Sequence, residues 1–249
     1  MMKRAWLAAA TVAALAVPAF AAEETVTFPS GAEKATGLLV TPAGKGPSPA
    51  VIVIQEWWGL DDWVKGQARA LAAEGYAALA VDLYRGKVTS NPDEAHQLMN
   101  GLPPDRAMRD LKAALSYLKG RADVKKDRIG VIGWCMGGRY SLALATEEAG
   151  LAAVVAYYGA PPTDPAAIAR IKAPVLGNYG ALDEGPSPEQ VGAFEAAMKS
   201  AGKPLDVKIY EGAPHAFANP NNPWKGYREA SAKDAWARTT AFFAKHLKK

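Results

Sequence analysis

Residues 128–145 read RIGVIGWCMGGRYSLALA, and this stretch decides the fold that the sequence predicts. Apolar runs stand on both sides of a Gly-Trp-Cys-Met-Gly-Gly turn, which predicts a buried strand, a tight corner and a helix in direct succession. The corner holds Cys135, the only cysteine in the 249-residue chain. Gly-X-Cys-X-Gly at a strand-to-helix corner is the nucleophile-elbow pattern with cysteine in place of serine. We therefore expect Cys135 to act as a nucleophile, against the alternative of a buried, inert thiol.

Glycines on both sides of Cys135 suit the backbone that such a corner requires. The nucleophile lies in a sharp, strained turn, so the residues two before and two after it must lack bulk, and here they are Gly133 and Gly137. Gly138 permits close packing of the following helix on the sheet. The N-terminus of that helix favours a thiolate. The backbone N–H of Met136 is the expected first donor to an oxyanion.

The rest of the chain alternates between strand and helix patterns. Apolar, β-branched runs predict strands over 24–30, 35–43, 50–56, 76–84, 151–159, 173–180 and 205–212, besides the one that enters Cys135. Helical spacing predicts helices over 62–75, 91–100, 104–120, 187–202 and 227–247, besides the one that leaves Cys135, with Asp164 as a further candidate N-cap. This alternation predicts an α/β fold with a mostly parallel central sheet covered by helices on both faces. In such sheets functional side chains gather at the carboxyl ends of the strands.

The N-terminus has the pattern of an export signal. Residues 1–22 combine a basic start, an apolar run over 5–17 and small residues at the end, with cleavage expected after Ala21 or Ala22. We expect a cleaved signal peptide, followed by one domain over 23–249 that works in the periplasm or outside the cell. The alternative is an uncleaved anchor, but the apolar run is short for a span of ~20 residues.

The composition disfavours some classes of binding partner. The formal net charge is +4, but no dense stripe of Lys and Arg appears, so nucleic-acid binding is not expected. No membrane contact is expected after the signal is removed. The remaining partner is a small molecule. The sequence leaves the oligomeric state open and is compatible with a monomer.

A nucleophile needs a base within reach and an acid that orients the base. Of the three histidines, His96 belongs to a polar helix and His246 to the last, lysine-rich helical turn, whereas His215 follows the last predicted strand. The chain order nucleophile, acid, histidine of the elbow-type hydrolases therefore indicates His215 as the base. Asp183 follows the strand over 173–180 and is the expected acid, with the adjacent Glu184 as an alternative.

Six motifs, spaced along the chain, together resemble one known family. QEWWG, VDLYRG, GWCMGG, YYG, GALD and GAPHAFA occur in the order found in dienelactone hydrolases, which have the α/β-hydrolase fold. The likeness covers roughly residues 25–247. It implies that a Cys135–Asp183–His215 triad hydrolyses a small ester or enol-lactone through an acyl-cysteine, without a cofactor or a metal ion.

The resemblance also implies roles for residues after the strand over 50–56. Glu56, in the QE motif, would approach the thiol and help it to ionise when substrate arrives; without the resemblance it could be a simple strand-end charge. The backbone N–H of Trp57 would be the second oxyanion donor. The aromatic residues Trp57, Trp58, Trp63 and Tyr84 could line an apolar acyl site or could serve only in packing.

Two positions bear on the charge of the substrate. The family holds an anionic lactone with arginines, one shortly after the DLY motif and one just after H-x-F-A. Arg85 lies within one residue of the first position and is the expected substrate-binding cation. Asn219 occupies the second, and an amide does not replace a bidentate guanidinium. Anionic dienelactone could then be a poor substrate, unless Lys225 or Arg228 compensates.

Other classes of function remain as alternatives. An exported, non-catalytic binding or stress protein could keep the same fold, and it would be indifferent to the loss of Cys135. The local signatures of thiol proteases are absent. The scattered histidines and the lack of an H-E-x-x-H motif disfavour a metal hydrolase.

Overall fold

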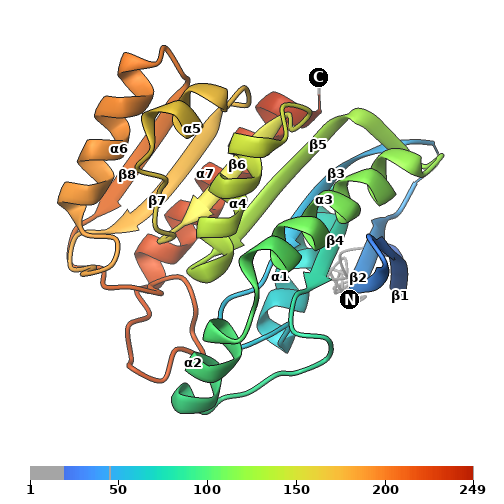
Figure 1. Ribbon diagram of the computed structural model, residues 1–249, viewed down its shortest axis with the longest axis horizontal. Helices are drawn as coiled ribbons and strands as arrows, with labels where there is room; N and C mark the ends of the chain where they lie inside the picture. The colour runs from blue at the N-terminus through green and yellow to red at the C-terminus, as the bar shows by residue number, and fades with distance from the viewer. Residues whose placement is uncertain (1–19, 45, 249) are drawn as a thin grey trace, which may run out of the picture.

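The chain forms an eight-stranded, mostly parallel sheet with helices on both faces (Figure 1). A computed structural model describes residues 20–44 and 46–248. The strands are β1 (Phe20–Ser30), β2 (Glu33–Pro42), β3 (Ser48–Ile54), β4 (Ala77–Asp82), β5 (Val124–Trp134), β6 (Ala153–Tyr157), β7 (Val175–Gly180) and β8 (Leu205–Tyr210). The helices are α1 (Asp62–Ala73), α2 (Pro92–Asn100), α3 (Pro104–Gly120), α4 (Met136–Glu147), α5 (Pro165–Arg170), α6 (Pro188–Ser200) and α7 (Glu229–Leu247).

The strands lie in the order β1-β2-β4-β3-β5-β6-β7-β8. β1 pairs with β2, and β2 with β4, in antiparallel fashion. From β4 onward every pair is parallel. The carboxyl ends of β3, β5, β6, β7 and β8 therefore meet at one end of the sheet, which is where parallel sheets carry their functional groups.

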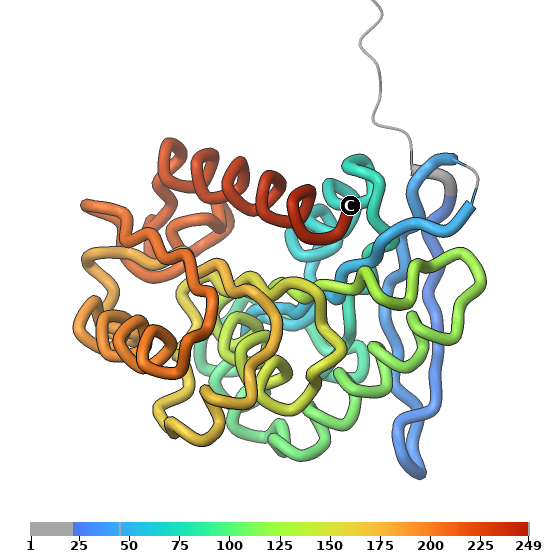
Figure 2. The backbone as a smooth tube through the Cα atoms, turned by 90° about the horizontal axis from the view of Figure 1, so that it is seen from above, coloured from blue at the N-terminus to red at the C-terminus, as the bar shows by residue number. Residues whose placement is uncertain are grey.

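Two apolar layers hold the helices on the sheet. In β3, Ile52 and Ile54 face one layer, whereas Val51 and Val53 face the other, as the period of a strand buried on both sides requires. α1 and α7 cover one face, and α3, α4 and α6 cover the opposite face (Figure 2). The predicted α/β-hydrolase fold is confirmed.

Most expected elements are present within two or three residues of their predicted ends, and α3 matches its predicted bounds. The short helix α5 is the element that the strand and helix patterns did not give, although its N-cap was predicted: the Asp164 carboxylate accepts hydrogen bonds from the N–H groups of Ala166 and Ala167. The predicted signal peptide lies outside the described residues up to position 19, and residues 20–22 belong to β1. Among the described residues, no helix has the length and apolarity to cross a bilayer.

Candidate active site

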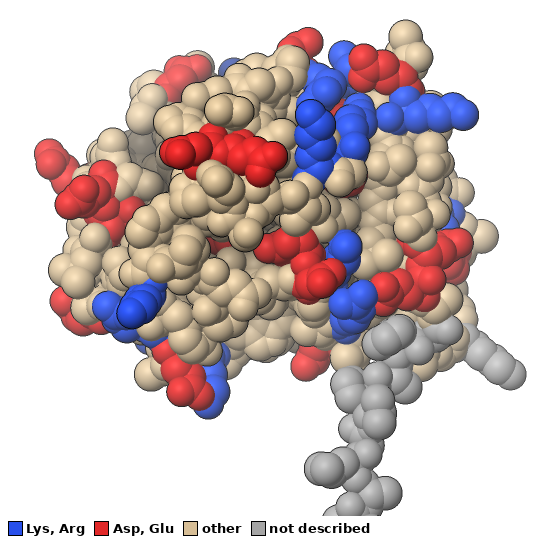
Figure 3. Space-filling view, turned by 90° about the horizontal axis from the view of Figure 1, so that it is seen from below, with Lys and Arg blue, Asp and Glu red and all other residues tan. Residues whose placement is uncertain are grey.

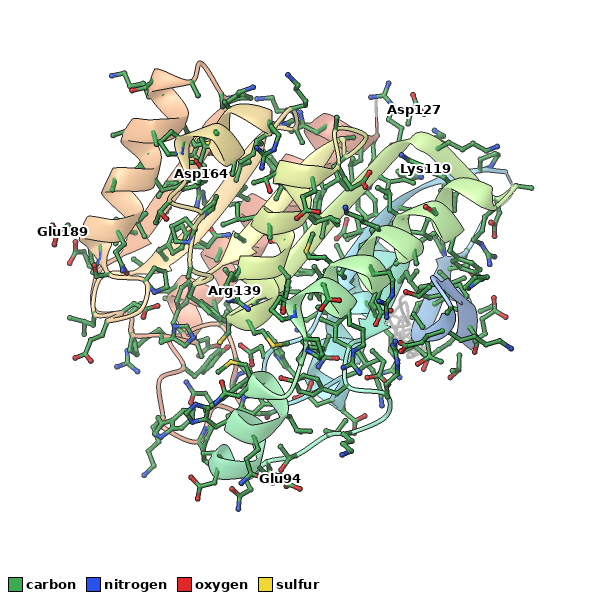
Figure 4. All side chains as sticks on the ribbon, in the orientation of Figure 1. Glu94, Lys119, Asp127, Arg139, Asp164 and Glu189 are labelled. Atoms are coloured by element: carbon green, nitrogen blue, oxygen red, sulfur yellow. The ribbon has the colours of Figure 1, made fainter. Side chains whose placement is uncertain are left out.

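Cys135 occupies the corner between β5 and α4, as predicted. Its backbone has φ 54° and ψ −116°, a strained conformation for a residue that is not glycine. The turn is fixed on both sides, because the N–H of Cys135 donates to the Tyr157 carbonyl at 3.0 Å and the N–H of Arg139 donates to the Cys135 carbonyl at 3.1 Å. Figure 4 labels Arg139 in the first turn of α4, near the middle of the view, far from Lys119 and Asp127 at the upper right. The thiol is thus presented at the carboxyl end of the sheet.

Close backbone contacts explain the glycines of this corner. A Cβ atom on Gly133 would collide with the backbone of Gly137, and one on Gly137 would collide with the carbonyl of Ile54 in β3. A Cβ on Gly138 would lie 2.6 Å from the Tyr157 carbonyl oxygen, closer than real Cβ atoms come. The corner therefore tolerates no side chain at these three positions.

His215 and Asp183 come together at the ends of β8 and β7. The imidazole Nδ1 lies 2.8 Å from Oδ2 of Asp183, whose side chain is buried, while the His215 side chain is 36% exposed. Burial lowers the pKa of His215, but the hydrogen bonds to Asp183 and to Cys135, with their charges, raise it further, to about 10. His215 is therefore hydrogen-bonded to Asp183 and lies close enough to Cys135 for the two groups to interact. Glu184 is exposed, and no bond joins it to this pair.

Glu56 follows β3 and is buried beside the same group of residues. Its Oε2 accepts a hydrogen bond from the Asn219 amide at 2.6 Å, and its Oε1 accepts one from the Tyr158 hydroxyl at 3.2 Å. Burial raises the pKa of Glu56 to about 7, although both hydrogen bonds and the charge of His215 oppose the rise. Glu56 is thus a carboxyl group that changes its protonation state near neutral pH.

Tryptophan rings surround the mouth of the site. Trp57 and Trp58 follow Glu56, and the ring of Trp224 lies 5.9 Å from the first and 5.7 Å from the second. On the other side, the Tyr84 hydroxyl lies 3.3 Å from the sulfur of Met136, the residue after Cys135. Aromatic side chains from three different loops therefore lie beside the residues that follow β3 and β5.

Arg85 is engaged away from the mouth. Its Nη2 lies 2.8 Å from a carboxylate oxygen of Asp110, which is fully buried, and 3.4 Å from the carboxylate of Glu33. Asp110 also accepts a hydrogen bond from the Ser30 hydroxyl at 2.6 Å. In this arrangement the guanidinium joins α3 to the first two strands, and its role in substrate binding stays a prediction.

The two predicted oxyanion donors lie at suitable places in the backbone. Met136 is the first residue of α4, where helical N–H groups have no acceptor within their own helix. Trp57 lies in the turn after β3, which pairs with β5 in parallel. Both N–H groups therefore follow the carboxyl ends of the neighbouring strands β3 and β5, and their function stays a prediction.

The chain matches the model of the dienelactone hydrolase family over residues 35–247. It belongs to this family. The match spans all the site residues described above, and the family consists of hydrolases that act on esters and lactones. The chain is accordingly a hydrolase with the α/β-hydrolase fold.

Individual relatives agree with the family match. A protein of Methylorubrum extorquens named "Putative carboxymethylenebutenolidase" is 34% identical over 219 residues, covering 82% of this chain and 75% of its own. "Protein usf" of Aquifex pyrophilus is 34% identical, covering 89% of this chain and 98% of its own. A solved structure, that of a dienelactone hydrolase-like promiscuous phosphotriesterase from metagenomic libraries, has a TM-score of 0.83 at 28% identity, covering 91% of this chain and 98% of its own.

Three residues of the site carry contacts that the dienelactone hydrolase motifs did not predict. Tyr158 has φ 38° and holds Glu56, and its ring packs edge-on against His215 with centroids 5.1 Å apart. Asn219 was recognised as a departure from the family, but its bond to Glu56 was not foreseen. Trp224 lies in the loop after β8, and only its aromatic character in a polar loop could have drawn attention to it. His96 is exposed on α2, as expected, 6.4 Å from the ring of Trp57.

Titratable side chains do not gather into a metal site in the described part of the chain, where no group of three or more His, Cys, Asp and Glu residues could hold an ion. The surface at the carboxyl end of the sheet mixes small groups of basic and acidic side chains with wide uncharged areas (Figure 3).

Proposed function

We propose that this protein hydrolyses a small, uncharged ester or lactone through an acyl-cysteine formed on Cys135. The observation that carries the proposal is the hydrogen bond of His215 to Asp183 beside Cys135, whose half-buried thiol lies at a strained corner. A nucleophile, a base in contact with it and a buried acid that orients the base are the parts that nucleophilic acyl transfer needs.

In the first half-reaction the proton shared by Cys135 and His215 lies on the imidazole, and the thiolate sulfur attacks the acyl carbon. Asp183 accepts a hydrogen bond from the other ring nitrogen and stabilises the imidazolium that forms. The N–H groups of Trp57 and Met136 donate to the oxyanion of the tetrahedral intermediate. The bond to the leaving oxygen then breaks, and His215 gives its proton to that oxygen, which leaves an acyl-cysteine and a free alcohol.

In the second half-reaction water replaces the alcohol. His215 removes a proton from the water, whose oxygen attacks the acyl carbon. The carbon–sulfur bond breaks, the carboxylic acid leaves, and the proton on His215 returns to the sulfur. No cofactor enters this sequence.

Glu56 assists the ionisation of Cys135. The charges of Glu56 and His215 interact, so an ionised Glu56 stabilises the imidazolium that appears when the thiol loses its proton. The Asn219 and Tyr158 hydrogen bonds favour this ionised form, because they donate to the carboxylate. Proton transfer to His215 therefore becomes easier above the pKa of Glu56.

The charges around the thiol favour an uncharged substrate. Arg85 forms ion pairs with Asp110 and Glu33, and the side-chain amide of Asn219 donates a hydrogen bond to Glu56. A carboxylate placed in the mouth would meet neither of the guanidinium groups that the family uses. We accordingly expect neutral esters to be hydrolysed in preference to anionic lactones of the same size.

We propose further that the protein is exported. Residues 1–22 have the three parts of a signal peptide, and Glu23, the first residue after them, forms a bidentate ion pair with Arg69 at 2.7 Å. The test is the mass of the N-terminal peptide after expression of the full chain in a Gram-negative host. A mature protein that begins near Glu23 in the periplasmic fraction supports export, and an intact Met1 in the cytoplasm overturns it.

The activity is tested with a panel of neutral and anionic small esters and lactones, including dienelactone, in the unmodified protein and in Cys135→Ala. Hydrolysis that vanishes in the variant supports the acyl-cysteine, and trapping the acylated protein by mass spectrometry identifies the residue. Equal hydrolysis in both proteins excludes Cys135 as the nucleophile. The absence of hydrolysis from both would favour a binding function instead.

A further inference from the structure

Exposed apolar side chains gather beside His215. In the described part of the chain, Leu182 (61% exposed), Trp224 (59%) and Val88 (51%) are the large apolar residues with the most exposed side chains. Leu182 and Trp224 line the same cavity, whose volume is about 380 Å³, and Pro214 and His215 complete its walls. Exposed apolar surface of this kind costs solvation free energy and commonly marks a ligand or partner site.

The Trp224 ring is fixed in place rather than loosely exposed. One side of it packs on Trp57 and Trp58, with centroid distances of 5.9 and 5.7 Å. Its backbone N–H donates to the Asn222 side chain at 3.0 Å, and the Asn222 amide in turn donates to the His215 carbonyl at 3.4 Å. The same loop thus holds the proposed base and the aromatic ring at a set distance from one another.

The cavity wall favours uncharged over anionic ligands. The titratable side chains that line it are Asp183, Glu184 and His215, and His215 is paired with Asp183. None of them is a lysine or an arginine, and the exposed Glu184 adds a negative charge at the rim. An uncharged ligand with a flat or bulky apolar part suits this wall.

The position of His215 in the cavity wall indicates which part of the ester lies in the cavity. In acyl transfer the imidazole gives its proton to the oxygen of the departing alcohol, so this oxygen must lie within hydrogen-bond distance of the ring. The His215 side chain is both the proton donor and a wall of the cavity. We propose that this cavity binds the alcohol part of the ester and selects uncharged aromatic alcohols, which stack on the free face of Trp224; the inference rests on the proposed hydrolase mechanism.

The same preference for aromatic alcohols should apply when an alcohol, in place of water, attacks the acyl-cysteine. An aromatic alcohol in the cavity can attack the acyl-cysteine in place of water: its oxygen forms a bond to the acyl carbon and the carbon–sulfur bond breaks. His215 takes the hydroxyl proton and returns a proton to the sulfur. The products are a new ester and the free thiol, so no further reactant is needed.

The first experiment compares benzyl acetate with methyl acetate. Both esters give the same acetyl-cysteine, and their alcohols are of nearly equal acidity, so the ratio of their kcat/KM values reports binding of the alcohol part. We expect a preference for the benzyl ester of about tenfold or more, and a loss of about tenfold in that ratio in Trp224→Ala, which is the usual size of a stacking contact. Trp224→Phe should keep most of the preference, and Leu182→Ala should lose part of it.

The matched control is Val88→Ala, which removes another exposed apolar side chain, one that does not line this cavity. Its benzyl-to-methyl ratio should equal that of the unmodified protein. An unchanged ratio in both Trp224→Ala and Leu182→Ala overturns the proposal. So does a change that appears instead in the ratio of methyl butyrate to methyl acetate, since that would assign the cavity to the acyl part.

A second measurement separates this proposal from the proposed function. Binding of benzyl alcohol to Cys135→Ala is followed by the shift of the Trp224 indole N–H resonance, assigned by its loss in the Cys135→Ala/Trp224→Phe double variant. A saturable shift without hydrolysis of any ester by the unmodified protein would support the cavity while the catalytic proposal fails. Hydrolysis by the unmodified protein, without any shift of the resonance on adding benzyl alcohol, would support the catalytic proposal and overturn the alcohol-binding cavity.

Discussion

The corner at Cys135 and the loop over residues 211–228 both belong to the candidate site, but different forces hold them. At the corner, backbone packs on backbone, and Gly133 and Gly137 are in contact with their neighbours without any side chain between. In the loop, asparagine side chains make the connections: Asn219 reaches Glu56 in the segment after β3, and Asn222 joins the His215 carbonyl to the N–H of Trp224.

This difference determines how each region responds to change. A close-packed backbone has no room to adjust, so a single added methyl group shifts the whole corner. A hydrogen-bonded loop loses one connection at a time, and each connection to a neutral group is worth about 1 kcal/mol. A single substitution at the corner should therefore reduce both stability and activity. A single substitution in the loop should remove only the function of the hydrogen bond that it breaks.

Gly133→Ala should have the largest effect. The new Cβ would collide with the backbone of Gly137, so we expect a loss of about 3 kcal/mol in the free energy of unfolding. The displaced thiol should reduce kcat/KM by at least about 100-fold. Urea unfolding and ester hydrolysis measure the two effects.

Gly192→Ala is the matched control for that variant. Gly192 lies within α6 with no neighbouring atom within 4 Å of an added Cβ. The substitution should raise stability by roughly 0.5–1 kcal/mol, since alanine favours the helix. Equal effects of the two substitutions would show that the corner is not close-packed in solution.

Asp183→Asn should reduce kcat by about 10³–10⁴-fold with little change in stability, which is the size seen when a triad loses its orienting acid. The loss has a second signature, because the Asp183 carboxylate is a principal cause of the raised pKa of His215. The pKa of His215 is about 10 in the unmodified protein and should be lower in Asp183→Asn. NMR of the imidazole ring measures it in both proteins. A larger loss of kcat in Glu184→Gln would instead assign the orienting role to the neighbouring carboxylate.

The fold and the corner could be predicted from the sequence because their causes are local. The apolar runs of β3 and β5 give their burial directly, and glycines around a cysteine at a strand end have one common physical reason. The order of Cys135, Asp183 and His215 then indicated the pairing that the structure shows between the last two. The short helix α5 lacked a periodic pattern of sufficient length, and only its N-cap was apparent.

The side-chain contacts of the site could not be predicted in the same way. Asn219 and Glu56 are 163 positions apart, and nothing in either local sequence specifies their bond. The expectation for Arg85 came from its position after the DLY motif, whereas its observed partners, Asp110 and Glu33, depend on how α3 packs against β1 and β2. Such contacts depend on tertiary packing, which periodicity does not encode.

Asn222→Ala tests whether the loop fails in parts. It removes two side-chain hydrogen bonds, so we expect a loss of about 1–2 kcal/mol in the free energy of unfolding. Trp224 and His215 should then become more mobile together, with kcat/KM for benzyl acetate reduced several-fold. Asn221→Ala is the control, because Asn221 enters the loop's hydrogen bonds through its backbone N–H. Equal losses in the two variants would contradict the anchoring role of Asn222.

Asn219→Ala should have the smallest and most selective effect, a change in pH dependence. The lost amide donates to the Glu56 carboxylate, and a hydrogen bond to a charged group of about 1.5–3 kcal/mol corresponds to roughly 1–2 pH units. The pKa of Glu56 should rise from about 7, so the acid limb of the kcat/KM profile should move to higher pH by that amount, with the plateau little changed. Because the folded protein binds the Glu56 proton more tightly than the unfolded chain does, this group's contribution to stability falls as pH rises from 4.5 through about 7, and in Asn219→Ala the fall should extend to higher pH.

Tyr158→Phe removes the longer hydrogen bond to Glu56, of 3.2 Å, and should shift the acid limb less than Asn219→Ala does. An acid limb that stays in place in both variants would mean that Glu56 does not control the ionisation of Cys135, and the loop would then hold His215 and Trp224 alone.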